Sequence, residues 1–352
     1  RDLTPEQRAK QEASGARKVV RFRTPLEGPT KFLDVVRGEV VFDNSTLDDF
    51  VLLKSDGYPT YHLANVIDDH LMQVSHVMRA DEWLSSTPRH VLLYRALGWE
   101  PPQFAHLPMI LGPDRSKLSK RHGATSLLEY RDRGYLPEAM MNFLGLLGWS
   151  LDDHTELFTR EELMKHFSLE RIGKTGAIFS LEKLDWMNGV YIRGLSLDDF
   201  VAQALPFLDK GLPPEVPRPL PQDYVKTIAP LVQERVRVLG EMAELTEFFF
   251  ANSLEYDAGL LLGKNLSREK AGEALKIALD KLKALEGFDA ASLENVLRPL
   301  AAELGLKTGD FFGLLRMATT GRTAAPPLFQ TMAVLGRERC LNRLEQALAR
   351  VS

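Results

Sequence analysis

Residues 111–123 read LGPDRSKLSKRHG, a segment dense in lysine and arginine. Positions 113–123 hold four positive side chains and one negative side chain, and Gly112 and Gly123 bracket them. Lys117 and Lys120 flank a Leu-Ser pair. A mobile loop that presents ammonium groups is suited to stabilising charge on a departing pyrophosphate, because lysine acts as a point charge. The alternative is a solvated basic surface loop, the usual reason for a run of charges.

The composition sets bounds around this loop. The chain has 352 residues, enough for two or three domains, and its 44% hydrophobic and 26% charged residues are ordinary for a globular protein. The net charge of −4 argues against a generic nucleic-acid coat but allows local basic patches. A single cysteine, Cys340, excludes an internal disulfide and a multi-cysteine zinc site. No apolar run approaches the ~20 residues of a membrane helix, so no membrane partner is expected.

The first third of the chain predicts a mixed α/β layer. Residues 1–16 predict a helix that Thr4 and Gln7 begin with a capping box. Residues 59–97 are mostly helical, with a break near 75–80. Strands that alternate with helices are typical of an α/β fold. Short strands are predicted at residues 19–23, 35–42, 51–54 and 108–111, the last of them buried.

The remainder of the chain predicts an array of helices with almost no strand signal. Thr159 with Glu162, and Ser196 with Asp199, have the spacing of capping boxes. Residues 211–221 contain five prolines and predict a linker. Helical periodicity covers residues 124–132, 137–147, 160–166, 181–187, 197–209, 223–250, 267–286, 292–304, 310–318 and 328–350.

Several segments of the sequence resemble those of one enzyme family. The string KLSKR at 117–121 resembles the KMSKS signature of class I aminoacyl-tRNA synthetases. Longer segments resemble bacterial-type glutamyl-tRNA synthetases. They follow one another along the chain in the same order as in that family, from about residue 17 to the C-terminus. These segments are LKSDGYPTYHLANVIDDH at 53–70, RADEW at 79–83, the basic segment at 111–123 and WMNGVYIR at 186–193. The resemblance implies ATP-dependent activation of L-glutamate to glutamyl-adenylate and transfer to the 3′ end of tRNA(Glu).

The resemblance also implies a multidomain architecture. An α/β part, comprising the C-terminal half of a class I Rossmann catalytic domain and part of its α+β insertion, is expected before all-α stem-contact and anticodon-binding domains. The expected divisions are 1–50 for the remainder of the acceptor-stem insertion, 51–123 for the Rossmann half, 124–196 for the stem-contact domain, and 197–252 and 253–352 for two helical anticodon-binding domains.

Four residues are candidates for binding glutamate. Tyr61 and Asn65 are spaced i, i+4 and so share one helix face. Arg79 offers a fork that matches a carboxylate bidentately, and Trp83, also i, i+4 if the segment is helical, offers a flat apolar wall. The alternatives are an ion pair of Arg79 with the acidic residues that follow it and a core position for Trp83. The resemblance assigns the pocket role to all four.

The basic loop is the candidate for the ATP chemistry. The resemblance implies that Lys117 and Lys120 are catalytic and stabilise pyrophosphate, with ATP contacts from Leu111, Lys117, Ser119, Lys120 and Arg121. Mg²⁺ is expected to arrive with ATP. No protein-bound metal is expected, because residues 68–70, Asp-Asp-His, match no zinc-ligand spacing.

A second set of residues is expected to contact tRNA. The resemblance implies that Arg235 reads the third anticodon base, an arginine associated with discrimination against tRNA(Gln). It also implies an anticodon-reading cluster of Arg316, Thr320, Pro326 and Leu328. The alternative for this cluster is simply one helix end followed by the next helix start. Four arginines near the C-terminus suggest either phosphate contacts or a solvated helical face: Arg337, Arg339, Arg343 and Arg350.

One family signature is not found. Class I synthetases carry a His-x-Gly-His word that holds ATP, and none of the eight histidines has that spacing. The resemblance therefore implies a chain that lacks the N-terminal part with this motif, as a truncated, proteolysed or naturally split form, inactive alone. Two alternatives stay open: a non-discriminating synthetase that also charges tRNA(Gln), and a non-catalytic tRNA-binding module. A cytoplasmic monomer is expected.

Overall fold

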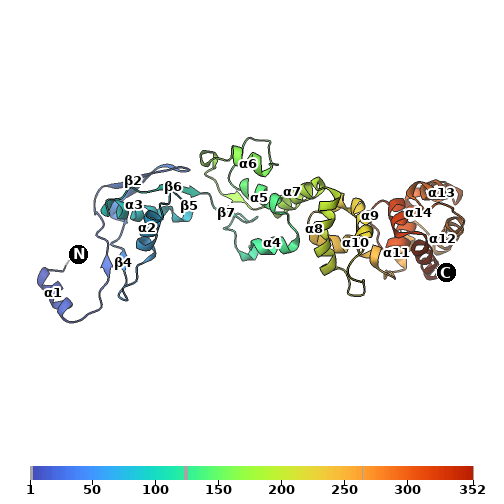
Figure 1. Cartoon of the computed structure of the whole chain (residues 1–352), viewed down its shortest axis with the longest axis horizontal. Coiled ribbons are helices and arrows are strands. Elements are labelled where there is room, and N and C mark those ends of the chain that lie inside the picture. The colour runs from blue at the N-terminus through green and yellow to red at the C-terminus, as the bar shows by residue number, and fades with distance from the viewer. Residues whose placement is uncertain (1–2, 123–125, 264, 352) are drawn as a thin grey trace. The chain divides into compact units, whose positions relative to one another are not determined.

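The computed structural model describes residues 3–122, 126–263 and 265–351 (Figure 1). The chain forms two compact units. Unit 1 comprises Arg1–Gly123 and Met141–Ser180, and unit 2 comprises Ala124–Met140 and Leu181–Ser352. The five-domain division expected from the sequence stays a prediction. Among the residues that the structure describes, we find no helix with the length and apolar character needed to cross a bilayer.

A four-stranded sheet organises unit 1 (Figure 1). Its strand order is β3-β2-β6-β5, in which β2 and β3 form an antiparallel hairpin and β6 runs parallel to both β2 and β5. Parallel neighbours need a crossover connection, and here η2 and α3 supply it between β5 and β6. The bounds of these elements are β2 (Pro29–Asp34), β3 (Gly38–Asp43), β5 (His76–Ala80), η2 (Asp81–Ser86), α3 (Thr87–Ala96) and β6 (Gln103–Leu107).

The strand predicted at 35–42 is confirmed from Gly38 onward, where it is β3, but residues 35–37 form the turn that precedes this strand. The Asp34 carboxylate accepts hydrogen bonds from the backbone N–H groups of Val36 and Arg37, which reverses the chain locally. Gly38 follows with φ +83°, a conformation that glycine adopts without strain. The sequence prediction therefore missed β2 and found only the second half of the hairpin.

The break predicted near 75–80 is a strand, β5, rather than an irregular loop. The predicted strand at 108–111 is mostly wrong: the buried strand is β6, and only β7 (Ile110–Leu111) lies in the predicted range. Helix α2 (Tyr61–Leu71) packs with α3 around a small core that includes Val66 and Leu93. The α/β class predicted from the sequence is confirmed.

The other elements of unit 1 lie outside the four-stranded sheet. The capping box of the first helix is confirmed, since Thr4 and Gln7 exchange side-chain to backbone hydrogen bonds, and so is that of Thr159 with Glu162. In unit 2, Ser196 caps its helix by accepting the Asp199 N–H, but Asp199 bonds to the Ser196 hydroxyl, which is half of the predicted box. The remaining elements of unit 1 are α1 (Pro5–Ala13), β1 (Val20–Arg21) antiparallel to β4 (Val51–Leu53), β8 (Ala177–Ile178) parallel to β7, the short helices η1 (Asn44–Thr46), η3 (Lys120–His122) and η4 (Leu169–Arg171), and α6 (Arg160–His166).

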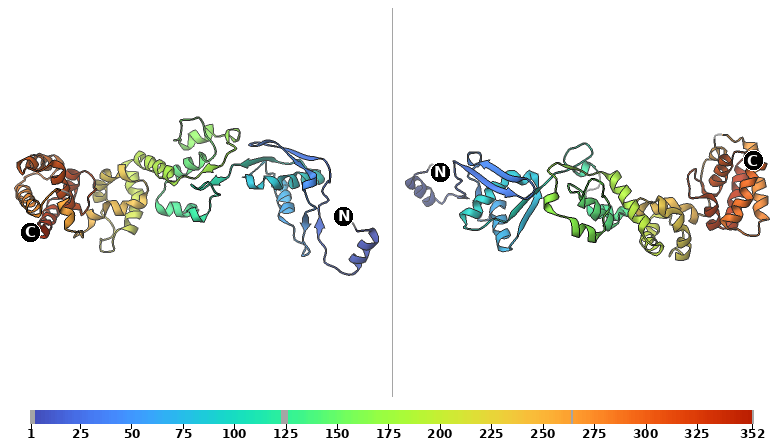
Figure 2. Two further views of the ribbon diagram at one scale, coloured as in Figure 1. Left: turned by 180° about the vertical axis from the view of Figure 1, so that it is seen from behind. Right: turned by 90° about the horizontal axis from the view of Figure 1, so that it is seen from above.

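Unit 2 is helical, as predicted. The ranges predicted as single helices at 223–250 and 328–350 each divide, the second at Gly336, whose φ is +82°. Figure 2 shows the later helices, in orange and red, from two further directions. The helices are α4 (Leu127–Arg133), α5 (Pro137–Gly145, which contains the boundary between the units), α7 (Leu181–Gly194), α8 (Leu197–Gly211), α9 (Gln222–Val232), η5 (Gln233–Arg235), η6 (Leu239–Glu241), α10 (Met242–Phe250), α11 (Gly259–Leu262), α12 (Arg268–Lys283), α13 (Ala290–Glu303), α14 (Thr308–Thr320), α15 (Leu328–Leu335) and α16 (Arg337–Val351).

The proline-rich segment 211–221 is not a free linker, so that prediction is wrong. Its apolar residues Leu212, Val216 and Leu220 are all buried in one hydrophobic cluster with α8 and α9. The prolines therefore shape a packed loop that belongs to the core of unit 2 rather than separating two domains.

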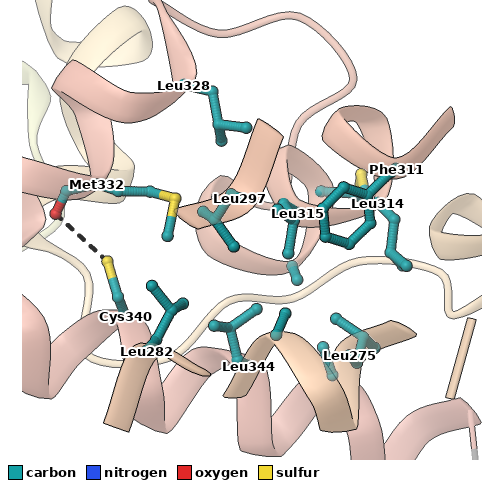
Figure 3. Close-up of a cluster of buried hydrophobic side chains, with 14 of the residues drawn as sticks. Leu275, Leu282, Leu297, Phe311, Leu314, Leu315, Leu328, Met332, Cys340 and Leu344 are labelled. Atoms are coloured by element: carbon teal, nitrogen blue, oxygen red, sulfur yellow. Dashed lines mark hydrogen bonds between the residues drawn. The ribbon is translucent and has the colours of Figure 1, made fainter. Parts of the chain in front are cut away.

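A second hydrophobic cluster forms the core of the last part of unit 2 (Figure 3). Leucines of α12, α13, α14 and α16 converge there, together with Leu328 and Met332 of α15 (Figure 3). The Cys340 thiol is fully buried and donates to the Met332 carbonyl oxygen at 3.4 Å. Burial raises the pKa of Cys340 to about 12, which makes this thiol inert.

The arginines of α16 stabilise the fold. Burial overturns both expectations for Arg343, whereas phosphate contact stays a prediction for the other three, which are partly exposed. Arg343 is 1% exposed and donates to the carbonyl oxygens of Thr319, Phe248 and Ala251. The other three do likewise at partly exposed positions: Arg337 to Leu282 and Glu286, Arg339 to Phe249 and the Tyr224 hydroxyl, and Arg350 to Leu254.

We expect Arg343→Met to lower the free energy of unfolding by about 2–4 kcal/mol, because two buried carbonyl groups and one partly buried carbonyl group lose their donor. Urea unfolding followed by circular dichroism measures the change. Arg268→Met, at an exposed position of α12, is the matched control and should stay within about 0.5 kcal/mol of the parent. Equal stability of the two variants would contradict the assigned role of Arg343.

Candidate functional site

Three of the four predicted glutamate-binding residues meet beside the carboxyl end of β5. Arg79 lies on β5, Tyr61 is the first residue of α2, and Trp83 lies in η2. The Tyr61 and Trp83 ring centroids are 5.3 Å apart, and the Arg79 guanidinium carbon lies 5.9 Å from the centroid of the Trp83 ring. The premise that Arg79 and Trp83 share a helix was wrong, but the strand and the turn that follows bring the two side chains together.

Several side-chain atoms of the described residues are buried here without a hydrogen-bond partner, and two of them belong to predicted site residues: Asn65 Oδ1 and Arg79 Nη1. Asn65 lies one helical turn after Tyr61 on α2. Buried polar groups in native proteins are nearly always paired, so two unpaired ones in one region need an explanation. A bound molecule that offers both a donor and an anionic acceptor would satisfy both atoms.

Arg79 is held by neighbours that the sequence analysis missed. Its Nε donates to His106 Nε2 at 3.2 Å and its Nη2 donates to Thr87 Oγ1 at 2.8 Å. His106 is in turn bonded to the carboxylate of Asp34 at 2.6 Å. A carboxylate and an imidazole at inward positions of strands are the only sequence signal that could have pointed to this arrangement. Burial lowers the pKa of Arg79, while nearby Tyr61 and the carboxylates oppose the shift, so the side chain stays cationic at neutral pH.

The basic loop begins as a tight hairpin. Leu111 and Lys117 form a β-bridge, and Gly112 N–H donates to the Ser116 carbonyl oxygen at 2.8 Å. Arg115 has φ +62°, in the left-handed region that non-glycine residues rarely adopt. Strain of this kind is concentrated at functional sites. Gly123, the second bracketing glycine, lies outside the described residues.

The loop contacts the glutamate-site region through Lys117. The Lys117 Nζ atom lies 2.5 Å from Glu82 Oε2, and Glu82 precedes Trp83 in η2. The other candidates for ATP contacts follow closely: Ser119 is half-buried, and Lys120 and Arg121 are exposed in η3. Arg121 donates to Ser116 Oγ at 2.7 Å. The structure therefore brings the two predicted sites of unit 1 together.

Two histidines lie beneath Tyr61. His62 Nδ1 and His90 Nε2 are 3.0 Å apart, and the Tyr61 ring centroid lies within 6.0 Å of both rings. Burial, reinforced by the charge of Arg79, lowers the pKa of His90 to about 3, and burial also lowers the pKa of His62. Both rings are therefore neutral at physiological pH and add no charge to the pocket.

The predicted tRNA-binding residues differ in accessibility. Arg235 is exposed at the end of η5, while Arg316 is half-buried on α14 with its Nε unpaired among the described atoms. The Thr320 hydroxyl donates to the Arg316 carbonyl oxygen at 2.7 Å, and Pro326 and Leu328 are buried. The alternative of a helix end and a helix start is confirmed for the last three. Contact with tRNA stays a prediction for all five.

A cavity of about 710 Å³ in unit 2 lies beside this helix end. It is lined by Phe248, Asn252, Thr320 and Arg322 among others, and the Arg322 guanidinium carbon lies 5.5 Å from the centroid of the Phe248 ring. An aromatic ring, a guanidinium plane and an amide are the groups with which proteins stack and hydrogen-bond unpaired bases.

Comparison with known proteins agrees with this geometry. Residues 1–186 match the family model of the catalytic domain of class I tRNA synthetases (E and Q), and residues 199–348 match an anticodon-binding domain. A glutamate–tRNA ligase from Dehalococcoides mccartyi strain 195 is 60% identical over 95% of this chain and 69% of its own length. The ligase from Moorella thermoacetica is 47% identical over 99% and 71%.

A solved structure shows the same fold. It is a glutamate–tRNA ligase from Elizabethkingia meningosepticum in complex with its amino acid, with a TM-score of 0.86 and 34% identity. The match covers 99% of this chain and 72% of the other.

The depressed pKa of His90 predicts acid sensitivity of unit 1. The unfolded chain protonates this imidazole below its ordinary value of 6.5, whereas the folded chain does so only near 3. The unfolded state therefore binds more protons between these values, and the free energy of unfolding should fall as pH drops below 6.5, by about 1.4 kcal/mol per pH unit for one proton.

We expect His90→Gln to make this fall shallower in urea unfolding between pH 6.5 and 5. The exposed His154, changed to Gln, is the control and should leave the slope as in the parent. An unchanged slope in His90→Gln would contradict the assignment of a neutral, buried His90.

Proposed function

Since the chain belongs to the family of glutamate–tRNA ligases, class I aminoacyl-tRNA synthetases, we propose that it activates L-glutamate with ATP beside the carboxyl end of β5 and transfers the glutamyl group to tRNA(Glu). One observation carries the assignment of the site: Arg79 presents a buried, unpaired Nη1 beside Tyr61 and Trp83. Ligands of parallel sheets bind at the carboxyl ends of the strands, where Arg79 lies.

Arg79 is proposed to bind the side-chain carboxylate of glutamate. An arginine fork pairs with a carboxylate through two parallel hydrogen bonds, and Nη1 and the second proton of Nη2 remain available for this. Glutamine offers an amide in place of one acceptor oxygen, so a donor of Arg79 would stay unpaired against it. Tyr61 and Asn65, on one face of α2, are proposed to orient the amino acid, with Trp83 as an apolar wall.

The activation step needs negative charge to be stabilised. An α-carboxylate oxygen of glutamate attacks the α-phosphorus of ATP, the bond to the β-phosphate oxygen breaks, and glutamyl-adenylate and pyrophosphate form. Lys117 and Lys120 are proposed to stabilise the charge that develops on pyrophosphate. Lys117 would exchange its partner Glu82 for a phosphate oxygen, which couples ATP binding to movement of the loop.

ATP contacts are proposed for Leu111, Ser119 and Arg121 as well. Mg²⁺ is proposed to arrive with ATP, coordinated mainly by phosphate oxygens. The loop fits this arrangement because it offers ammonium and guanidinium groups to the phosphates, while the carboxylate of Asp114 has a cationic partner in Arg121.

In the transfer step, unit 2 is proposed to bind the tRNA. The 3′-terminal ribose hydroxyl of tRNA attacks the carbonyl carbon of the adenylate, and AMP leaves. Arg235, Arg316, Thr320, Pro326 and Leu328 are proposed to form the anticodon-reading surface. Arg235 is the exposed member, and Arg316 is half-buried. Thr320, Pro326 and Leu328 are buried and would support the surface.

We expect Lys120→Ala to lower ATP–pyrophosphate exchange by the ligase at least 100-fold, because a preorganised charge on the leaving group is lost. Binding of tRNA should change less than about 2-fold, since the anticodon surface is intact. Lys31→Ala, at an exposed position of β2, is the matched lysine control. Exchange at the parental rate would contradict the role of the loop.

We expect Arg235→Gln to reduce charging of tRNA(Glu) by about 10-fold and to relax discrimination against tRNA(Gln), because one base-reading fork is removed. Charging assays with both purified tRNAs measure the ratio. Arg268→Gln serves as an exposed arginine control elsewhere in unit 2. If the parent already charges both tRNAs equally, the enzyme is non-discriminating and the role of Arg235 is refuted.

A further inference from the structure

A buried chain of hydrogen bonds runs across three strands of unit 1, from Asp34 on β2 through His106 on β6 to Arg79 on β5. Asp34 is 1% exposed and His106 is fully buried. The parallel register of β5 and β6 places Arg79 directly opposite His106. The Asp34 and His106 side chains take no part in the reaction described above. The series of hydrogen bonds that they form nevertheless ends at Arg79, the residue proposed to select the substrate.

The hydrogen-bond donor on Arg79 determines which ring nitrogen of His106 carries the proton. The Nε of arginine can only donate, so His106 Nε2, at 3.2 Å from Arg79 Nε, must be the acceptor. The ring proton therefore lies on Nδ1, where it is donated to Asp34 Oδ2 at 2.6 Å. Burial lowers the pKa of His106 despite the opposing effect of Asp34, which agrees with a neutral ring.

Asp34 is itself anchored by the backbone. Its Oδ1 accepts N–H groups of Val36, Arg37 and His106 at 2.8–3.2 Å. Burial opposes the charge of this carboxyl, but the bonds from His106 and the backbone outweigh it and keep its pKa below the ordinary value. The carboxylate is therefore a fixed acceptor and determines which nitrogen of His106 carries the proton.

We propose that Asp34 and His106 are positioning residues for substrate selection. Asp34 holds His106 as the Nδ1–H tautomer, and Nε2 of that ring orients Arg79 toward the side-chain carboxylate of glutamate. The inference rests on the proposed role of Arg79. With Nε bound to His106 and Nη2 to Thr87, the guanidinium plane has two fixed points, and Nη1 is the group left for the ligand.

Two substitutions of His106 separate the hydrogen bond of its Nδ1 to Asp34 from the contacts of its Nε2 with Arg79 and with Thr87 Oγ1, which lies 3.0 Å away. The amide nitrogen of asparagine reaches the place of Nδ1, so His106→Asn keeps the bond to Asp34 but loses the acceptor for Arg79. The amide of glutamine reaches the place of Nε2, so His106→Gln keeps an acceptor for Arg79 but loses the donor to Asp34.

We expect His106→Asn to raise the KM for glutamate in ATP–pyrophosphate exchange about 10–100-fold, because a misplaced guanidinium loses the bidentate geometry. The KM for ATP should stay within about 3-fold. His106→Gln should remain closer to the parent in the KM for glutamate. Equal KM values for glutamate in the two variants, whatever their thermal stabilities, would overturn the proposal, since a purely structural role does not distinguish the two hydrogen bonds.

Asp34→Asn tests the tautomer without a change of shape. The oxygen of the amide must stay at the Oδ1 position to accept three backbone N–H groups, so its NH₂ faces His106 Nδ1. The ring proton then moves to Nε2 and opposes Arg79 Nε–H. We expect a raised KM for glutamate and weaker discrimination against glutamine. A lowered melting temperature with an unchanged KM for glutamate would overturn the proposal.

A direct measurement covers the case in which a variant fails to fold. Long-range ¹H–¹⁵N correlation spectra of the unmodified, ¹⁵N-labelled protein report the histidine tautomers. Signals of an Nδ1–H tautomer for His106, neutral at pH 7, are expected. An Nε2–H tautomer or an imidazolium ion would overturn the proposal.

Two controls distinguish this proposal from the proposed function. His76→Asn changes an exposed histidine on β5 and should leave all kinetic constants unchanged. Arg79→Ala should raise the KM for glutamate at least as much as His106→Asn. If Arg79→Ala leaves that KM unchanged, the assigned glutamate site fails; if it raises the KM but His106→Asn and Asp34→Asn do not, only the positioning proposal fails.

Discussion

The parallel pairing of β5 with β6 is the constraint on which the rest of unit 1 depends. It sets Arg79 opposite His106, and the crossover through η2 delivers Trp83 and Glu82 to the same region. Helix α2 packs against α3, and its first residue, Tyr61, lies in the same region, beside Trp83. A change in this register would separate the groups from one another, because neighbouring strand positions face opposite sides of the sheet.

Arginine has a second, structural use in this chain. Arg37 donates to the carbonyl oxygens of His106 and Lys174 and to Asp81, which ties the β2–β3 turn to β6 and η2. The arginines of α16 similarly satisfy carbonyl groups at helix ends and in the loops that follow them in unit 2. Such guanidinium groups are already committed within the fold, so the number of arginines overstates the positive charge that faces RNA. The proposed attraction to tRNA is therefore assigned to exposed arginines such as Arg235.

Periodicity predicted the helices of unit 2 well, because long amphipathic segments with recognisable caps carry a local signal. It failed where the signal is non-local. The strand β2 depends on a turn that Asp34 builds, and the packed character of segment 211–221 depends on leucines and a valine whose partners lie on α8 and α9. At the site, residue types and resemblance indicated Tyr61, Arg79 and Trp83. Asp34 and His106 could not be found this way, because 72 residues separate them and only the sheet brings them together.

The use of an imidazole between Asp34 and Arg79 has a physical reason. A carboxylate in direct contact with Arg79 would orient the guanidinium equally well, but it would also neutralise the charge that is proposed to attract the carboxylate of glutamate. A neutral imidazole supplies an acceptor of fixed direction and almost no opposing charge. The carboxylate of Asp34 acts one residue further away, where it fixes the tautomer and where backbone N–H groups already stabilise its charge. Orientation and charge, which conflict in a simple ion pair, are thereby assigned to different groups, and Arg79 remains both fixed and cationic.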